Sequence, residues 1–184
     1  VAVSVSCVDH QRVRNDGPSK FKVRADVARR LEIADSFLGP VSLVVVEGHR
    51  ATTVQERFWN HRWAEVRLAH PDWSPVEVTA ETARFVAPPD GHPPHSTGGA
   101  VDVILTDVGG VEIDMGSALN DPGPKMAMDA DVGAEAREWR DRLSGAMSEA
   151  GFVNYPYEWW HFSYGDQYWA WRTQAPAALY GRVG

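Results

Sequence analysis

Cysteine is almost absent from this chain of 184 residues, because Cys7 is the only one. A single thiol cannot form an internal disulfide, and it cannot build a metal site rich in thiolates. Any transition metal bound by this protein must therefore be held by histidine and carboxylate side chains.

Long apolar runs and an excess of positive charge are also lacking. No stretch of about 18 apolar residues could cross a bilayer, and 43% hydrophobic with 23% charged residues is typical of a soluble globular protein. The 25 acidic and 18 basic residues give a net charge of -7, which provides no long-range attraction to phosphate backbones. We therefore expect neither a membrane nor a nucleic acid as partner.

Targeting signals and internal repeats are lacking as well. The first residues do not combine a basic start with an apolar stretch, so cytoplasm is the default expectation, although a signal peptide already removed would leave no trace. The length fits one domain over residues 1–184, with residues 1–18 as an irregular N-terminal arm.

Apolar residues at helical spacing predict four helices. The first lies within residues 20–38, and the second begins at a capping box of Thr53 and Glu56. The third begins at a capping box of Ser74 and Glu77. The fourth carries an apolar stripe over residues 136–150, with Asp131 as its cap and Gly151 as its stop.

Runs of β-branched and aromatic residues predict strands over residues 41–46, 101–105, 152–164 and 168–171. Proline- and glycine-rich loops occupy residues 87–99 and 120–131. Because the helices and strands do not alternate regularly, the sequence predicts a single-domain α+β fold with a mostly antiparallel central sheet flanked by helices.

The first segment that can do chemistry runs from His95 to Asp102. Gly98 and Gly99 bar a continuous helix, so His95 should lie on the loop and Asp102 on the following strand. A half-buried carboxylate without a partner costs on the order of several kcal/mol, and a metal ion would be such a partner. The alternative is that Asp102 accepts hydrogen bonds from turn amides and His95 is a surface residue.

The second segment is Glu158-Trp159-Trp160-His161. The two indoles can exclude water and so strengthen electrostatic interactions. Burial would raise the pKa of Glu158 and a nearby cation would lower it, a balance that suits a base acting near neutral pH. The alternative is a set of core aromatics with an incidental glutamate and histidine.

Together the two segments offer the composition of a catalytic zinc site. Two histidines and one carboxylate, His95, Asp102 and His161, leave a fourth position for water, whose pKa zinc lowers to about 7. Glu158 can take the proton of that water without being a ligand. Arg50, at the end of the strand over residues 41–46, could stabilise an oxyanion, or it could form an ordinary surface ion pair.

Other catalytic signatures are missing. The sequence has no His-Glu-x-x-His helix, no Gly-x-Ser-x-Gly elbow, and no phosphate-loop or dinucleotide-binding motif. These absences argue against serine hydrolases, NTPases and dehydrogenases.

Four short motifs occur in a characteristic order: Glu47-Gly48-His49-Arg50, His95-x-x-Gly98-x-Ala100-x-Asp102, Asp114-Met115-Gly116 and Glu158-Trp159-Trp160-His161. In this combination the chain resembles the D-alanyl-D-alanine dipeptidases of the VanX type. These zinc peptidases share a fold with D,D-carboxypeptidases and the hedgehog domain. The resemblance implies zinc ligation by His95, Asp102 and His161, with Glu158 as general base and then proton donor, and Arg50 as the group that steadies the oxyanion.

The resemblance also implies hydrolysis of D-Ala-D-Ala, a cell-wall peptidoglycan precursor, in the cytoplasm. It places substrate contacts at Asn120, Asp121, Trp159 and Ser96. Two positions depart from the family pattern: Pro93 stands where the family usually has serine, and Asn120 stands where it has an aspartate that faces the substrate ammonium. An amide cannot supply that charge.

The leading hypothesis is therefore a zinc-dependent dipeptidase acting on a small dipeptide, with D-Ala-D-Ala first among the candidates. One alternative is a D,D-carboxypeptidase or another zinc amidohydrolase that uses the same centre on a different substrate. A second alternative is a non-catalytic module that binds zinc and uses the fold for recognition.

Overall fold

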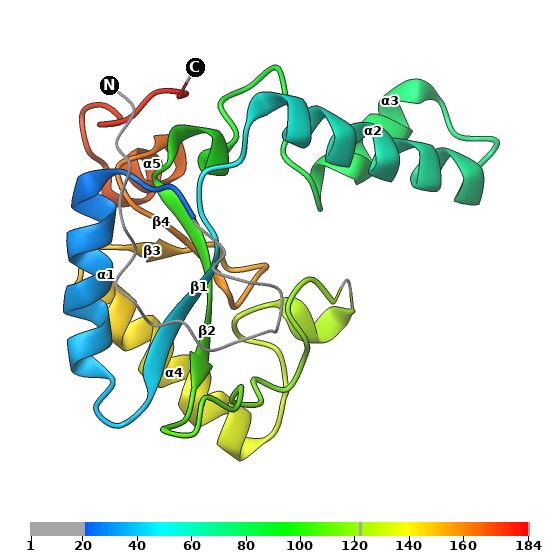
Figure 1. Cartoon of the computed structure of the whole chain (residues 1–184). Helices are drawn as coiled ribbons and strands as arrows, with labels where there is room; N and C mark the ends of the chain where they lie inside the picture. Colours follow the sequence, from blue (N-terminus) through cyan, green and yellow to red (C-terminus); the bar gives the residue numbers. More distant parts are fainter. Residues whose placement is uncertain (1–20, 122, 184) are drawn as a thin grey trace.

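The computed structural model describes residues 21–121 and 123–183, and it contains one four-stranded antiparallel sheet (Figure 1). The strands lie in the order β1 (Ser42–Glu47), β2 (Ala100–Thr106), β4 (His161–Ser163) and β3 (Val153–Asn154). The predicted α+β class with an antiparallel sheet is confirmed. The arm expected over residues 1–18 lies outside the described residues.

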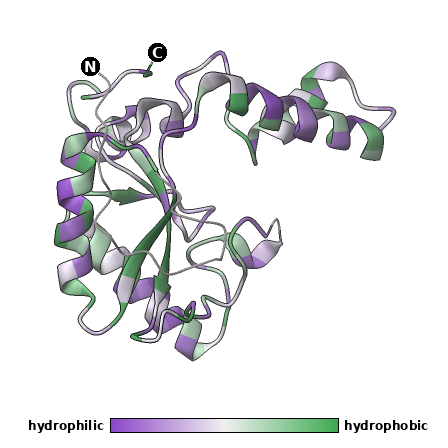
Figure 2. Cartoon of the chain, viewed as in Figure 1, coloured by the Kyte–Doolittle hydropathy of each residue, from purple (hydrophilic) through white to green (hydrophobic). Residues whose placement is uncertain are grey.

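Two long helices cover one face of the sheet. Helices α1 (Ala25–Phe37) and α4 (Ala134–Glu149) pack against each other, α1 against β1 and α4 against β3 (Figure 1). Their buried positions recur at helical spacing, as the sequence predicts, and they join the valines and leucines of β1 and β2 in the core. Much of strands β1 and β2 is coloured as hydrophobic in Figure 2.

Helices α2 (Thr52–Ala69) and α3 (Pro75–Ala83) pair with each other and project from the rest of the molecule (Figure 1). The capping box predicted for α3 is present, because Ser74 accepts from the Glu77 amide and Glu77 caps in return. The capping box predicted for α2 is wrong: this helix begins at Thr52, and its N-cap, Ala51, has no side-chain bond. None of the described helices combines the length and the apolar character needed to cross a bilayer.

Two further local predictions are wrong. Asp131 does not cap α4, because Gly133 occupies the N-cap position with a positive φ of 84°. Residues 168–171 belong to helix α5 (Gln167–Thr173) and not to a strand, although they are rich in aromatics. The Asp166 side chain accepts from the amide of Trp169 at 2.8 Å, and this cap favours a helix over the β-propensity of the aromatic residues.

A β-bulge in β1 decides which side chains reach the open face of the sheet. Val45 opposes Val103, but the next paired residue of β1 is Glu47, which opposes Asp102. On the other side of β2, Asp102 opposes His161 of β4. Directly opposed residues point to the same face, so Glu47, Asp102 and His161 form one polar row across three strands.

Arg140 of α4 is a completely buried cation that holds the loop between β2 and α4. Its guanidinium donates to the carbonyl oxygens of Met115 (2.8 Å), Lys125 (2.8 Å) and Ala127 (2.5 Å), and to the hydroxyl of Ser117 at 3.2 Å. Burial lowers the pKa of Arg140 to about 10, so the side chain remains charged at neutral pH.

We expect Arg140→Ala to lower the free energy of unfolding by about 3 kcal/mol or more, because it leaves one buried and three partly buried acceptors without this donor and opens a cavity. Denaturant unfolding measures this change. The matched control is Arg142→Ala on the same helix, since Arg142 is exposed and its one side-chain hydrogen bond to the described residues goes to the Leu38 carbonyl oxygen. Equal losses in the two variants would contradict the special role of Arg140.

Candidate active site

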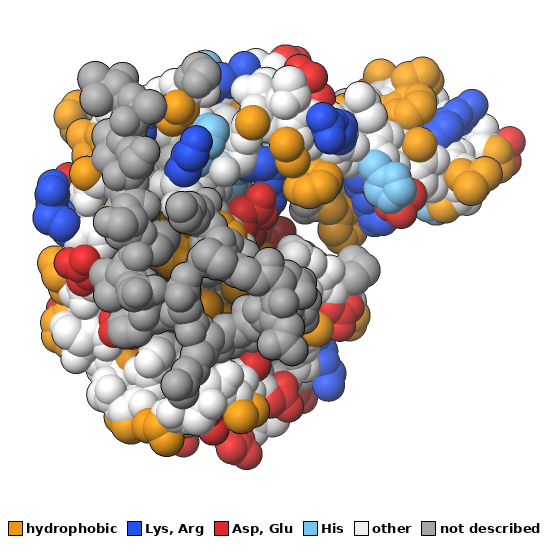
Figure 3. Space-filling model, in the orientation of Figure 1, with side chains coloured by type: hydrophobic (Ala, Val, Ile, Leu, Met, Phe, Trp, Pro, Cys, Tyr) orange, Lys and Arg blue, Asp and Glu red, His pale blue; other side chains and the backbone are white. Residues whose placement is uncertain are grey.

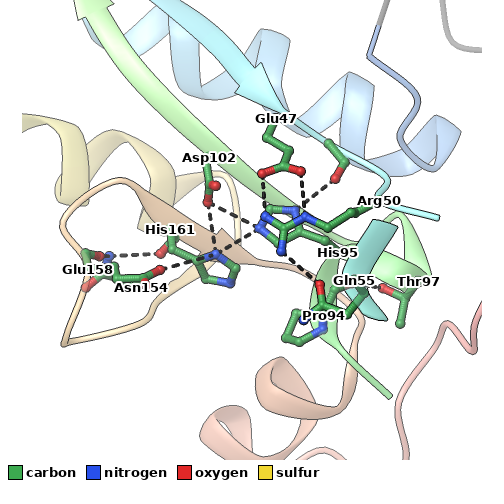
Figure 4. A network of polar contacts seen from close by, with 11 residues as sticks. Glu47, Arg50, Gln55, Pro94, His95, Thr97, Asp102, Asn154, Glu158 and His161 are labelled. Carbon is green, nitrogen blue, oxygen red and sulfur yellow. Dashed lines mark hydrogen bonds and ion pairs between the residues drawn. The ribbon is translucent and has the colours of Figure 1, made fainter. Parts of the chain in front are cut away.

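Three potential metal ligands converge on the open side of the sheet (Figure 4). His95 Nε2 lies 3.3 Å from Asp102 Oδ1 and 3.2 Å from His161 Nδ1, and His161 Nδ1 lies 3.0 Å from Asp102 Oδ1. In a tetrahedral zinc site with bonds of about 2.05 Å, neighbouring ligand atoms are about 3.3 Å apart. The triangle therefore has the size of one face of a zinc tetrahedron, and its donors are those that zinc prefers.

Each of the three ligands comes from a different element. Asp102 lies in β2 and His161 begins β4, so strand pairing alone brings them together. His95 lies on a short 3-10 helix, η1 (Pro94–Thr97), that follows the proline-rich loop. Gly98 ends this turn in the left-handed conformation, with φ of 71°, so the predicted break before the strand is present although the loop contains a regular turn.

The second nitrogen of His95 has a partner of its own. His95 Nδ1 lies 2.8 Å from the carbonyl oxygen of Gly48, at the end of β1. A carbonyl oxygen only accepts, so Nδ1 carries the hydrogen and Nε2 keeps its lone pair for a metal. The backbone of Gly48 thus fixes both the tautomer and the ring orientation.

The charge of Asp102 is stabilised by its two histidine neighbours. Burial by itself would raise the pKa of Asp102. The effect of His95 and His161 is larger, and it holds the pKa of Asp102 well below its usual range. For His161, burial would lower the pKa, but the hydrogen bond that His161 donates to Asp102 raises it. The carboxylate is therefore ionised at neutral pH, as a metal ligand must be.

Glu158 lies beside the three ligands but outside their triangle. Its Oε2 is 3.9 Å from His161 Nδ1, and 18% of its side chain is exposed. Burial, the largest effect, raises the pKa of Glu158 above its ordinary value. The turn that carries it is fixed by Asn154, which donates to the Glu158 carbonyl oxygen at 3.0 Å.

Arg50 is oriented by Glu47, to which the sequence assigned no role, and by Gln55, which the sequence did not single out. Its Nε and Nη2 donate to the two oxygens of Glu47 at 2.6 and 2.5 Å, and its Nη1 donates to Gln55 Oε1 at 2.8 Å (Figure 4). The Phe58 ring lies 4.8 Å from the guanidinium carbon. Of the five N–H groups of an arginine, two are left without an acceptor among the described residues.

The four residues predicted to contact the substrate differ from one another in their surroundings. The buried hydroxyl of Ser96 donates to the Pro93 carbonyl oxygen at 2.7 Å, and the indole of Trp159 donates to Ser117 at 3.1 Å. Asn120 and Asp121 are exposed on the loop before η2 (Pro124–Met126). No described contact joins any of the four to the metal-ligand triangle, so their role in substrate binding stays a prediction.

On the side that Figure 3 shows, the molecular surface is recessed. Acidic side chains gather where the surface recedes between the α2–α3 pair and the rest of the molecule. His92 is exposed and is not part of the triangle.

Comparisons of the sequence with known proteins identify its relatives. The family model described as D-ala-D-ala dipeptidase, a peptidase family, matches residues 19–177. A D-alanyl-D-alanine dipeptidase of Synechocystis sp. is 30% identical over 91% of this chain and 81% of its own length. One from Escherichia coli is 29% identical over 74% of this chain and 61% of its own length.

Solved structures with a similar fold include vancomycin resistance D,D-peptidases. The D,D-pentapeptidase VanY in complex with Zn(II) aligns with a TM-score of 0.53 at 18% identity, over 89% of this chain and 84% of its own. VanYB in complex with D-alanine-D-alanine aligns with a TM-score of 0.52 at 19% identity, over 94% and 88% of the two chains. With the family match over most of its length, the chain belongs to the D-Ala-D-Ala dipeptidase family of zinc metallopeptidases.

Proposed function

We propose that this enzyme hydrolyses a small free dipeptide, with D-Ala-D-Ala as its substrate, and that it acts in the cytoplasm on a cell-wall precursor. The observation that carries the proposal is the triangle of His95, Asp102 and His161 with Glu158 beside it and outside it. The names of the relatives support the choice of substrate. Cell fractionation tests the location, and recovery of the protein outside the cytoplasm would contradict that part.

In this proposal His95, Asp102 and His161 hold the zinc ion. When bound, zinc acts as a Lewis acid that polarises the substrate carbonyl and lowers the pKa of a water molecule. Glu158 accepts the proton of the attacking water and then donates it to the leaving amine. Its burial favours both steps, because a raised pKa makes the carboxylate a better base and its acid form easier to populate.

Arg50 has the complementary task of binding the oxygen of the scissile carbonyl as negative charge develops on it. The bidentate ion pair with Glu47 fixes the plane of the guanidinium, and Gln55 holds its other edge. The two remaining N–H groups are thereby preorganised, and they need not reorient during the reaction.

A panel of dipeptides tests this function. We expect the zinc-loaded enzyme to release product from D-Ala-D-Ala, and to leave N-acetylated D-Ala-D-Ala and longer peptides ending in D-Ala-D-Ala intact. Free L,L and mixed-chirality alanine dipeptides measure the stereochemical preference. Cleavage of only the blocked or longer peptides would identify a D,D-carboxypeptidase, and no cleavage of any peptide would favour the non-catalytic zinc-binding module.

A further inference from the structure

The last described segment of the chain, residues 179–183, runs beside the loop that carries His95 (Figure 1). We refer to these residues as the C-terminal strap. The amide of Val183 donates to the Ser96 carbonyl oxygen at 2.9 Å. The guanidinium of Arg182 contacts the carbonyl oxygens of Pro89 and Gly91. The strap therefore binds the chain on both sides of His95.

The other end of the strap is fixed to the chain just after strand β4, which ends at Ser163. The amides of Leu179 and Tyr180 both donate to the Gly165 carbonyl oxygen, at 2.7 and 2.9 Å. The ring of Tyr180 packs so closely on two glycines that a Cβ would come within 2.5 Å of it at Gly165 and within 3.2 Å at Gly99. Gly99 directly precedes β2, so the aromatic anchor lies where the metal-ligand loop enters the sheet.

Arg24, just before α1, joins the strap to the η1 turn. Its Nη2 donates to the Gly181 carbonyl oxygen at 2.9 Å, and its Nε donates to the Thr97 carbonyl oxygen at 2.7 Å. Its guanidinium carbon also lies 5.2 Å from the centre of the Tyr180 ring. The turn that carries His95 is consequently held between the start of α1 and the strap.

His95 depends on such contacts more than the other two ligands do. Asp102 and His161 are fixed by backbone pairing inside the sheet, whereas η1 is a turn of four residues after a proline-rich loop. Short 3-10 turns have poorer hydrogen-bond geometry than longer helices and provide little rigidity by themselves. The strap also lies beyond residue 177, where the match to the family model ends.

We propose that the C-terminal strap is a positioning element for His95, and that Arg182 is the residue in it through which zinc affinity is set. The inference rests on the proposed role of His95 as a zinc ligand. Arg182 touches neither metal nor substrate; it fixes the loop whose position determines where His95 Nε2 lies.

The test uses Arg182→Met in the full chain, because methionine keeps much of the apolar stem and removes the donors. We expect zinc to bind 10- to 100-fold more weakly, the usual effect of losing a group that orients a ligand. The zinc Kd is measured by competition with a chromogenic chelator, and the melting temperature of the zinc-free protein is measured in parallel. The matched control is Arg172→Met, because Arg172 is exposed at the end of α5.

A positioning role requires that Arg182→Lys recover part of the affinity, and that the zinc-free Arg182→Met protein melt within a few degrees of the wild type. A wild-type zinc Kd in Arg182→Met would overturn the proposal, as would an equal loss in Arg172→Met. A wild-type protein that binds zinc tightly but cleaves no dipeptide would contradict the proposed function alone. The strap proposal would then still be decided by the difference in zinc Kd.

Discussion

Replacing Glu158 by glutamine should lower kcat by about 10²- to 10⁴-fold and leave zinc binding at the wild-type level, since general acid-base catalysis contributes factors of this size. Glutamine keeps the shape of the side chain but cannot accept the proton of the attacking water. Zinc should remain bound because Glu158 lies outside the ligand triangle, with its Oε2 3.9 Å from His161 Nδ1. Steady-state kinetics and metal analysis of the same preparation measure the two quantities.

The matched control for this experiment is Glu149→Gln, since Glu149 is exposed on the last turn of α4. The control should retain both activity and zinc. Loss of zinc in Glu158→Gln would mean that this carboxylate is a ligand, and the assignment of separate roles would fail.

His161→Ala should differ in that it weakens zinc binding on the order of 10³-fold or more, because it removes one of the three assigned protein ligands. Turnover should disappear as a consequence of metal loss. Zinc content after dialysis and calorimetric titration measure the change. Exposed His92 provides the control His92→Ala, which should bind zinc like the wild type.

The same variant should also affect the zinc-free protein. Asp102 accepts from His161 at 3.0 Å, and this interaction helps to keep its pKa low in a buried environment. A group with a lowered pKa stabilises the fold above its unfolded pKa and loses that contribution as the pH falls. The zinc-free His161→Ala protein should therefore be less stable than the wild type at neutral pH.

Full retention of zinc in this variant would contradict the ligand assignment.

Local sequence patterns were sufficient for much of the fold. The apolar spacing of α1, the β-branched run of β1 and the capping box at Ser74 concern residues that lie close together in sequence. The end of α4 at Gly151, with φ of 87°, follows equally from local backbone preference. Such features depend little on the rest of the molecule, and for this reason they could be predicted.

The failures share a physical cause. Residues 168–171 have high β-propensity, but their conformation is decided by the Asp166 cap and by tertiary contacts such as that of the Trp169 ring with the Tyr164 ring. Asp131 and Thr53 are good capping residues by type, but the helices begin at neighbouring positions. Propensity differences of well under about 1 kcal/mol are easily overridden by tertiary contacts.

The sequence was sufficient to predict which residues form the candidate site, but not how their side chains are arranged. Residue type and the motif order were enough to single out His95, Asp102, His161, Glu158 and Arg50, and the structure brings the first four close together. The partners of Arg50 were missed. Gln55 is 2% exposed in a helix whose other residues mostly face solvent, and only the folded chain shows that its amide joins Arg50 to the Ala87 carbonyl oxygen.

The bulge at Val46 has a consequence for how far the site can vary. In a regular ladder Val46 would oppose Asp102, and Glu47 would be turned toward the face that the helices cover. With the bulge, Glu47, which supports Arg50, and the metal ligands Asp102 and His161 lie on adjacent strands. The separation of adjacent strands, about 4.8 Å, is common to all β-sheets. The distances between Glu47, Asp102 and His161 follow from strand register and not from the identity of the surrounding side chains, so their spacing can be preserved while the helical pair of α2 and α3 diverges.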